Sequence, residues 1–247
     1  MTLAELWNIY VQFMWDEKYI LGLEQFLKSH KIKTILDCAG GVGFPAIALK
    51  KKRWDIVYAD RSKEMFDFFE KKLQEEKINI PFYFVNWLEL SKKLDRKFDA
   101  VLCRGNSLVY VDSWGENNIQ KATKENIKKS LLEFWKVLNP GGLLYIDIIN
   151  KEEFDRTSYP IVEDYGEKVI DGRKVRLRWE MSHDYTTHMR TWKAIVSVDE
   201  ARYEFLYSSY LLRHEELVNM LNEIGFKNVQ EVKIGGENNY NVFVAFR

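Results

Sequence analysis

The residues best suited to chemistry in this chain gather around a glycine-rich turn near residue 40. The segment Thr34–Pro45 reads TILDCAGGVGFP: two β-prone residues lead to an acid, Asp37, and the chain then turns through Ala39–Gly43. An apolar helix is expected to follow over 44–52. A strand, a glycine turn and a helix start form a cradle of nucleotide size, because glycine lets the backbone approach a ligand and the helix start offers unpaired N–H groups.

Asp37 helps to decide which nucleotide the turn would hold. A dinucleotide would bring a pyrophosphate to the turn, and a carboxylate there would repel it. S-adenosylmethionine instead offers an ammonium group and ribose hydroxyls, from which a carboxylate can accept hydrogen bonds. The segment 41–46 still fits the loose pattern G-x-G-x-x-A, so an NAD-dependent oxidoreductase remains an alternative. A non-catalytic binding protein that keeps the same fold is a second alternative.

Further polar residues stand where later strands are expected to end. Asp60 closes the second strand, where an acid accepts hydrogen bonds from a ribose diol. Asn86-Trp87-Leu88 ends the third strand and offers an amide and two apolar side chains to an adenine. Asn106 lies in the Gly105–Ser107 turn after the fourth strand, where its carbonyl oxygen could orient an acceptor amine.

The elements that must position these residues alternate between strand and helix. Strands are expected at 33–38, 55–59, 82–85, 98–103 and 143–149, and helices at 44–52, 63–76 and 121–138. Ser62 is a candidate N-cap, and Asn139-Pro140-Gly141-Gly142 is a helix stop. The pattern predicts an α/β fold: a doubly wound, Rossmann-like, mostly parallel seven-stranded sheet with helices on both faces.

The pattern changes after Asn150. Strand-like segments flank Asp171-Gly172, a strong hairpin signal, so residues 151–210 are expected to form an antiparallel β lobe inserted after the fifth strand. A helix ended by Gly225 and a β-hairpin would close the chain over 211–247. Residues 1–30 are amphipathic and aromatic, and predict an N-terminal helical lid with Tyr10 and Tyr19 toward the ligand. With 31–150 as the cofactor-binding core, the whole chain 1–247 is expected to be a single domain, since no linker interrupts it.

Composition excludes several kinds of function. Lysine plus arginine and aspartate plus glutamate each number 37, and this balance argues against a nucleic-acid partner. No apolar run approaches the length of a membrane span and no signal peptide is recognisable, so no membrane partner is expected. Two cysteines without a C-x-x-C motif predict a cytoplasmic protein. The four histidines lack metal-ligand spacing, and no metal is expected. The oligomeric state stays open.

Five segments carry a resemblance to a known family. They read ILDCAGGVG (35–43), YADRSKEM (58–65), NWLEL (86–90), FDAVLCRGNS (98–107) and PGGLLYID (140–147). Together they resemble the class I S-adenosylmethionine-dependent methyltransferases and, more narrowly, the glycine N-methyltransferases. LWNIY (6–10) extends the resemblance toward the N-terminus, and it fades over the antiparallel lobe. It implies methyl transfer from S-adenosyl-L-methionine to a small molecule, most simply an amine nitrogen, with S-adenosyl-L-homocysteine as the product.

The resemblance implies roles for particular residues. The methionine moiety would be held by Asp37, Ala39, Gly40, Gly41 and Gly43, the ribose by Asp60 with Arg61 and Met65, and the adenine by Asn86, Trp87 and Leu88. Trp7 and Tyr10 would close the cofactor site, with Arg104 and Gly105 beside it. Asn106 would touch the acceptor. From the lobe, Tyr185 or Tyr207 could accept a hydrogen bond from the reacting nitrogen.

Two departures from the family pattern bear on the acceptor. The family carries an arginine for the acceptor's carboxylate where this chain has Ile149, and an aliphatic side chain cannot pair a carboxylate. A second family arginine, for the cofactor carboxylate, has no counterpart near Trp15, where Lys18 is the nearest base. Arg104 replaces an apolar residue of the family motif and could recognise a substrate anion. An acceptor larger or less acidic than glycine is therefore expected.

Overall fold

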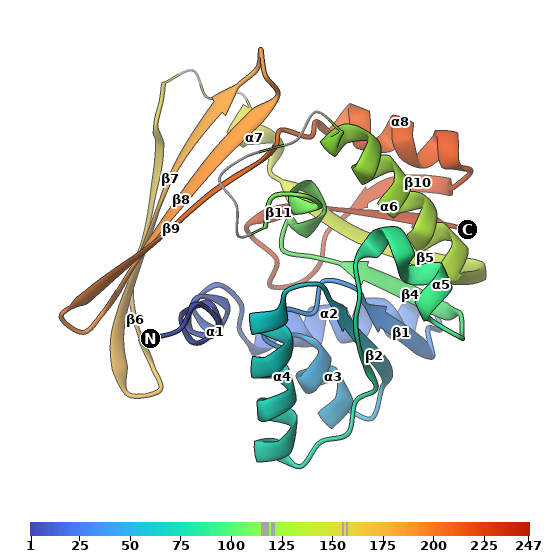
Figure 1. Ribbon diagram of the computed structural model, residues 1–247, viewed down its shortest axis with the longest axis horizontal. Coiled ribbons are helices and arrows are strands. Elements are labelled where there is room, and N and C mark those ends of the chain that lie inside the picture. Colours follow the sequence, from blue (N-terminus) through green and yellow to red (C-terminus); the bar gives the residue numbers. More distant parts are fainter. Residues whose placement is uncertain (115–118, 120–121, 155, 157) are drawn as a thin grey trace.

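A seven-stranded sheet runs through the centre of the molecule (Figure 1). The computed structural model describes residues 1–114, 119, 122–154, 156 and 158–247. The strand order is β10-β11-β5-β4-β1-β2-β3, and β11 runs antiparallel to the others. The strands are β1 (Thr34–Asp37), β2 (Asp55–Asp60), β3 (Phe82–Phe84), β4 (Phe98–Cys103), β5 (Leu138–Ile149), β10 (Lys227–Val232) and β11 (Tyr240–Phe246). The predicted mostly parallel seven-stranded sheet is confirmed.

The strand order places a crevice beside β1. The chain moves outward from β1 through β2 to β3 and then returns to β4 on the other side of β1. The crossover connections therefore diverge above the carboxyl ends of β1 and β4, and open α/β sheets bind their ligands at such a switch point. Strand β4 and the second half of β5 are almost wholly buried, as expected for parallel strands covered on both faces.

Helices cover both faces of this sheet (Figure 1). One layer contains α2 (Glu17–Ser29), α3 (Ala46–Lys51) and α4 (Lys63–Glu76), and the other contains α5 (Leu90–Lys93), α6 (Thr123–Val137) and α8 (His214–Ile224). The predicted N-cap is correct, because the Ser62 hydroxyl accepts from the backbone N–H of Met65. Gly225 ends α8 in the left-handed conformation, as expected of a glycine at that place.

A four-stranded antiparallel sheet follows β5. It contains β6 (Ile161–Ile170), β7 (Arg173–Asp184), β8 (Met189–Val198) and β9 (Ala201–Tyr210), joined to β5 through the short helix α7 (Lys151–Phe154). Asp171 and Gly172 both have positive φ, as a tight two-residue hairpin turn requires. Buried and exposed residues alternate along β7 and β8, so one face is turned toward the rest of the protein. The predicted antiparallel insertion is confirmed.

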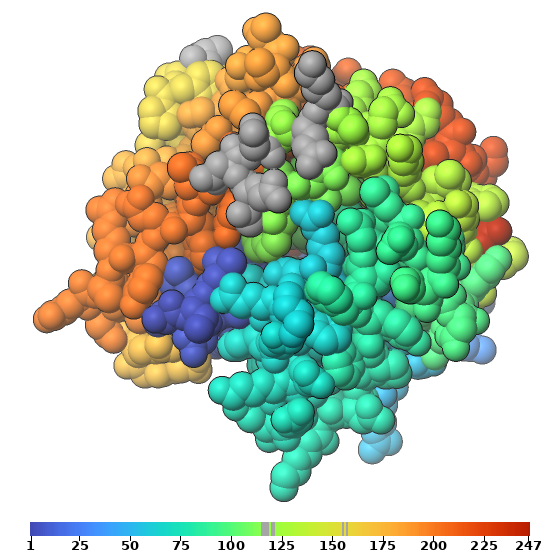
Figure 2. Space-filling view, in the orientation of Figure 1, coloured from blue at the N-terminus to red at the C-terminus, as the bar shows by residue number. Residues whose placement is uncertain are grey.

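Helix α1 (Leu3–Met14) lies between the two sheets. Thr2 caps it, because its hydroxyl accepts from the N–H of Glu5 while the Glu5 carboxylate accepts from the N–H of Thr2. The helix packs on α4 at one side and on β6 and β7 at the other. In the space-filling view its blue surface separates the orange antiparallel sheet from the cyan α4 region (Figure 2). It therefore occupies the position predicted for a lid.

Some details differ from the sequence-based expectation. Helix α2 belongs to a layer of the sheet and not to the lid, because its Tyr19 and Phe26 side chains contact Tyr145 of β5. Helix α3 begins at Ala46, since residues 40–45 form turns, and β5 begins at Leu138, which pairs with Phe98. The predicted helix start at 121 lies outside the described residues, as do positions 155 and 157 of the predicted lobe. No helix among the described residues is long and apolar enough to cross a membrane.

Candidate active site

A cavity of about 820 Å³ lies above the carboxyl ends of β1, β2 and β4. The antiparallel sheet and α1 form its opposite wall, so the parallel core, the insertion and the N-terminus all contribute to it. Ten of the residues predicted for the site line it: Trp7, Tyr10, Ala39, Gly41, Asp60, Arg61, Met65, Trp87, Gly105 and Asn106.

Asp60 and the glycine turn form one connected unit at the floor of the cavity. The two carboxylate oxygens of Asp60 accept hydrogen bonds from the backbone N–H groups of Gly41 and Ser62, each at 2.7 Å. Burial raises the pKa of Asp60, and these N–H groups partly offset the rise. Gly41 has φ +50 and a Cβ there would lie 3.6 Å from the Trp7 indole nitrogen, so this glycine faces the cavity. The acid thus both shapes the turn and presents a carboxylate to a ligand.

Gly40 and Gly43 do not line the cavity, contrary to prediction. A Cβ on Gly40 would lie 2.1 Å from ring carbons of Tyr58, and one on Gly43 would lie 2.6 Å from the ring of Phe69. Those two rings are stacked with centroids 3.8 Å apart. These two glycines therefore make room for an aromatic stack beneath the turn. Of the three glycines in the turn, Gly41 is the one that lines the cavity.

Asp37 and Arg104 lie buried just outside the cavity lining, at the ends of neighbouring strands. Neither oxygen of Asp37 makes a hydrogen bond of good geometry among the described residues, and burial raises its pKa to about 7 although Arg104 opposes the rise. Arg104 donates from Nε to the Tyr19 hydroxyl at 3.0 Å, and its Nη2 has no partner in the described part of the chain. Its guanidinium also lies 4.6 Å from the centre of the Trp15 ring, which does line the cavity.

Such a pair of unsatisfied buried charges is costly unless something completes it. An amino-acid group, with one ammonium and one carboxylate, matches an acid and a guanidinium held side by side. Arg104 also stands at the Trp15 ring, where the family pattern provides an arginine from the N-terminal segment and this chain does not.

The turn after β4 places Asn106 at the wall of the cavity. Asn106 has φ +54, a left-handed conformation that asparagine tolerates better than most residues. The buried carboxylate of Asp147 accepts from the backbone N–H groups of Gly105 and Asn106 and so holds this turn. The side-chain oxygen of Asn106 is buried and has no partner among the described residues. An unsatisfied acceptor at a cavity wall is suited to a ligand's N–H or O–H.

The predicted adenine end is only partly at the cavity. Trp87 lines it and donates from its indole nitrogen to the carbonyl oxygen of Cys38. Asn86 and Leu88 do not line the cavity. The Asn86 side-chain oxygen accepts a hydrogen bond from the Leu88 N–H at 3.0 Å and thereby caps the short helix η1 (Trp87–Glu89). The amide predicted for adenine recognition is thus occupied in shaping the loop that carries Trp87.

The two tyrosines predicted to assist the acceptor lie elsewhere. Tyr185 is 38% exposed, and its hydroxyl donates to the carbonyl oxygen of Phe154 at 2.8 Å, away from the cavity. Tyr207 stands behind the cavity wall, with its ring stacked on Trp114 at 4.9 Å. Burial raises the pKa of Tyr207 to about 12, so its phenol stays protonated near neutrality, and Tyr207 does not line the cavity where it was predicted to accept a hydrogen bond. Tyr19, proposed for the lid, is also buried behind the wall on Arg104 and Tyr145.

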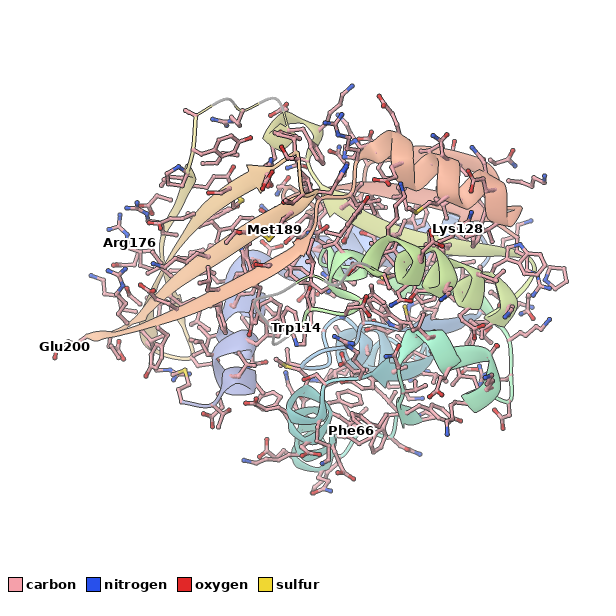
Figure 3. The ribbon with its side chains drawn as sticks, turned by 45° about the horizontal axis from the view of Figure 1, so that its top comes forward. Phe66, Trp114, Lys128, Arg176, Met189 and Glu200 are labelled. Atoms are coloured by element: carbon pink, nitrogen blue, oxygen red, sulfur yellow. The ribbon has the colours of Figure 1, made fainter. Side chains whose placement is uncertain are left out.

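Sequence reasoning missed several residues that do line the cavity. They are Trp15, Cys38, Ser107, Tyr110, Trp114, Arg190, Trp192 and Tyr240. Figure 3 shows Trp114 between the antiparallel sheet and the parallel core. A usable signal existed for Arg190, since it occupies the phase of β8 in which Trp192 and Ala194 are buried. A charged residue in the buried phase of a strand points to a polar function inside the protein.

Aromatic rings form most of the wall opposite the glycine turn. Trp7 stacks on Tyr10 with centroids 4.6 Å apart and meets Trp114 edge-on at 4.9 Å. Trp192 meets Tyr10 edge-on from the antiparallel sheet. Faces of this kind attract a desolvated cation. The cavity therefore brings together the carboxylate of Asp60, the amide residue Asn106 and an aromatic wall favourable to positive charge, with Asp37 and Arg104 buried just outside its lining.

Comparison with known proteins agrees with this arrangement. Residues 35–142 match the family model described as a methyltransferase domain. The chain is 27% identical to the glycine/sarcosine N-methyltransferase of Aphanothece halophytica, over 82% of this chain and 69% of that protein. Its fold matches Streptomyces venezuelae DesVI (TM-score 0.78, 17% identity, 99% and 98% of the two chains). It also matches S-adenosylmethionine-bound CalS10, an amino pentose methyltransferase from Micromonospora echinaspora (TM-score 0.72, 14% identity, 98% and 96%).

Family match, relatives and fold together identify the protein as a class I S-adenosylmethionine-dependent methyltransferase, and S-adenosylmethionine is its cofactor. The cofactor is therefore S-adenosylmethionine and not NAD. Within the class it is a small-molecule methyltransferase similar to the glycine/sarcosine N-methyltransferases.

Proposed function

We propose that the protein methylates an amine nitrogen of a small molecule. The observation that carries the proposal is the Asn106 side-chain oxygen, which is buried and unpartnered among the described residues and belongs to a residue that lines the cavity. An amide oxygen accepts an N–H of a neutral amine and thereby fixes the direction of the nitrogen lone pair. The Asp147 carboxylate keeps this oxygen in place through the backbone of the turn.

The cofactor would be held by residues around the rest of the cavity. Asp60 would accept from the ribose hydroxyls, and Trp87 would lie against the adenine. Asp37 and Arg104 would receive the ammonium and carboxylate of the methionine part. Bound S-adenosylmethionine supplies a methyl group on a sulfonium, and the ring of Trp7 or Tyr10 would stabilise that positive charge.

The remaining polar groups suit an amine better than an alcohol. A neutral amine attacks without help from a base and releases its proton afterwards, whereas an alcohol needs its proton removed during attack. Among the described residues that line the cavity there is no histidine or lysine, and the carboxylate of Asp60 is engaged by two N–H groups. The chain's own contribution would be alignment and exclusion of water, which are sufficient for this reaction.

Similar proteins point in the same direction. The relative from Aphanothece halophytica is a glycine/sarcosine N-methyltransferase, and CalS10 is an amino pentose methyltransferase. Both names describe acceptors that are small and carry an amine. They support the class of acceptor and leave its identity to experiment.

The deciding experiment combines binding and turnover. Calorimetric titration with S-adenosylhomocysteine and, separately, with NADH tests the cofactor site, and we expect only the first to bind. Transfer of radiolabelled methyl from S-adenosylmethionine is then measured with a panel of small amines, each paired with the alcohol of the same carbon skeleton. We expect labelled products from amines alone. Transfer to the alcohols at equal or greater rate would contradict the proposal while leaving the methyltransferase assignment intact.

A further inference from the structure

Arg190 brings a buried positive charge to the acceptor side of the cavity. It lies on β8, is 3% exposed and lines the cavity together with Tyr110 and Tyr240. The described cavity lining contains one other cation, Arg61, which follows Asp60 at the end of β2 and therefore belongs to the cofactor side. The sequence offered Arg104 for a substrate anion, and the family's own acceptor arginine is Ile149 here.

One edge of the Arg190 guanidinium is already engaged. Nε and Nη2 donate to the two oxygens of Glu153 at 2.7 and 3.3 Å, and Nη2 also donates to the sulfur of Met181. His183, which faces Arg190 across the β7–β8 pair, contacts the same carboxylate at 2.7 Å. These bonds occupy Nε and Nη2, so Nη1 remains for other partners, and the Tyr110 phenol is hydrogen-bonded to the same guanidinium.

Glu153 holds Arg190 and prevents it from turning away. The pKa of Glu153 is lowered to about 2 by Arg190 and His183 against the effect of burial, so the carboxylate is ionised under physiological conditions. Breaking such a buried pair is costly, and the arginine is accordingly fixed. On the other side, the phenols of Tyr110 and Tyr240 lie near enough to interact with the guanidinium charge and offer further O–H donors.

We infer that Arg190 is the specificity residue for a carboxylate carried by the amine acceptor. Its Nη1 group and the two tyrosine hydroxyls would receive that carboxylate, while Asn106 holds the amine nitrogen. The inference rests on the proposed function in so far as the acceptor is an amine. It also explains how the chain dispenses with an arginine at position 149: the positive charge is supplied from the antiparallel sheet.

Charge balance across the two ligands favours this acceptor. Arg190 and Glu153 together carry no net charge, and S-adenosylmethionine carries one positive charge on its sulfonium. A neutral amine with a carboxylate adds one negative charge, which balances the sulfonium of the cofactor. Neutrality matters in a buried site, where an uncompensated charge is expensive.

The test measures anion recognition separately from turnover. Protein saturated with S-adenosylhomocysteine is titrated with linear carboxylates of two to five carbons and with their primary amides, with and without a terminal amine. We expect the best carboxylate to bind about 10- to 100-fold more tightly than its amide, as for a hydrogen bond to a charged group. Amides that bind as tightly as carboxylates, or no binding of either, would overturn the inference.

Substitutions at two positions of β8 test whether Arg190 causes the preference for carboxylates over amides. Arg190→Lys keeps the charge that Glu153 needs but removes the fork, and we expect it to abolish most of the discrimination while S-adenosylhomocysteine affinity stays unchanged. Lys193→Met is the matched control, because Lys193 lies on the same strand, is partly exposed and pairs with Glu204 on the outside. Full discrimination in Arg190→Lys would contradict the role of Arg190. Carboxylate discrimination without any methylated amine would instead contradict the proposed function.

Discussion

Asp147 accepts a 2.6 Å hydrogen bond from the backbone N–H of Asn106, and both residues are buried at the edge of the cavity. The acid lies on β5 and the amide follows β4, so the bond ties two neighbouring parallel strands together where they end. The Asn106 side-chain oxygen has no hydrogen-bond partner within the described structure. The turn therefore holds a buried, unpartnered acceptor on a residue that lines the cavity.

This relationship predicts that Asn106 matters for turnover and little for cofactor binding. Asn106→Gly removes the side-chain oxygen and tolerates the positive φ, so we expect a loss of methyl transfer of about 100-fold. S-adenosylhomocysteine affinity, measured by calorimetry, should change less than about threefold. Asn106→Ala is the matched variant: the same loss of turnover is expected, with about 1 kcal/mol of lost stability from the strained φ. Equal losses of turnover and cofactor affinity would contradict this role.

A second prediction concerns the amino-acid end of the cofactor. Arg104→Lys keeps a positive charge beside Asp37 but cannot offer the unpartnered Nη2 group, and we expect S-adenosylhomocysteine to bind about tenfold more weakly. Methylthioadenosine has the adenosine and the sulfur but lacks the amino-acid group, and its affinity should stay the same. A parallel loss for both ligands in calorimetry would show that Arg104 supports the cavity as a whole.

The glycine turn allows a prediction that separates stability from binding. Gly40→Ala would drive a methyl group to 2.1 Å from the Tyr58 ring, which is pinned by Phe69, so we expect a loss of about 1–3 kcal/mol in unfolding free energy. Gly41→Ala meets no atom closer than 3.6 Å and should cost about 1 kcal/mol through its positive φ. Its methyl group enters the cavity, so cofactor affinity should fall more in Gly41→Ala. Denaturant melts and calorimetry on both variants make the comparison.

Much of the core was predictable because strand periodicity and strand ends are local properties. Asp60, Trp87 and Asn106 follow apolar segments, and parallel strands bring their carboxyl ends to one edge of the sheet, so their meeting at the cavity could be foreseen. Gly41 was foreseen for the same reason. The fold class follows equally from β–α alternation.

The rest depends on tertiary contacts that no local pattern encodes. The sequence suggests that Gly40 and Gly43 face a ligand, whereas in the structure they pack on the stacked rings of Tyr58 and Phe69. Which residues of the antiparallel lobe reach the cavity depends on how that sheet packs on the parallel core. In the observed packing Arg190 lines the cavity and Tyr185 does not. Asn86 reads as a recognition amide, but a local hydrogen bond to the backbone competes for its oxygen.

The final prediction follows from the raised pKa of Asp37, about 7, which results from burial. Below pH 7 the carboxyl of the ligand-free protein is largely protonated, and an ammonium group favours the ionised form. S-adenosylhomocysteine affinity should therefore rise as the pH increases toward 7, by at most tenfold per pH unit, and then level off. Asp37→Asn should remove this dependence.

The same shift has a consequence for stability with the opposite sign. The folded ligand-free protein binds a proton at Asp37 more tightly than the unfolded chain does, whose carboxyl has the ordinary value of 3.8. The free energy of unfolding should therefore fall between about pH 4 and 7, by up to about 1.4 kcal/mol per pH unit from this group. Asp147, whose pKa burial also raises, contributes in the same direction, so Asp37→Asn should reduce the slope and not abolish it. Denaturant melts at pH 5 and 7.5 test this, and an unchanged slope in Asp37→Asn would show that Asp37 is ionised in the ligand-free protein.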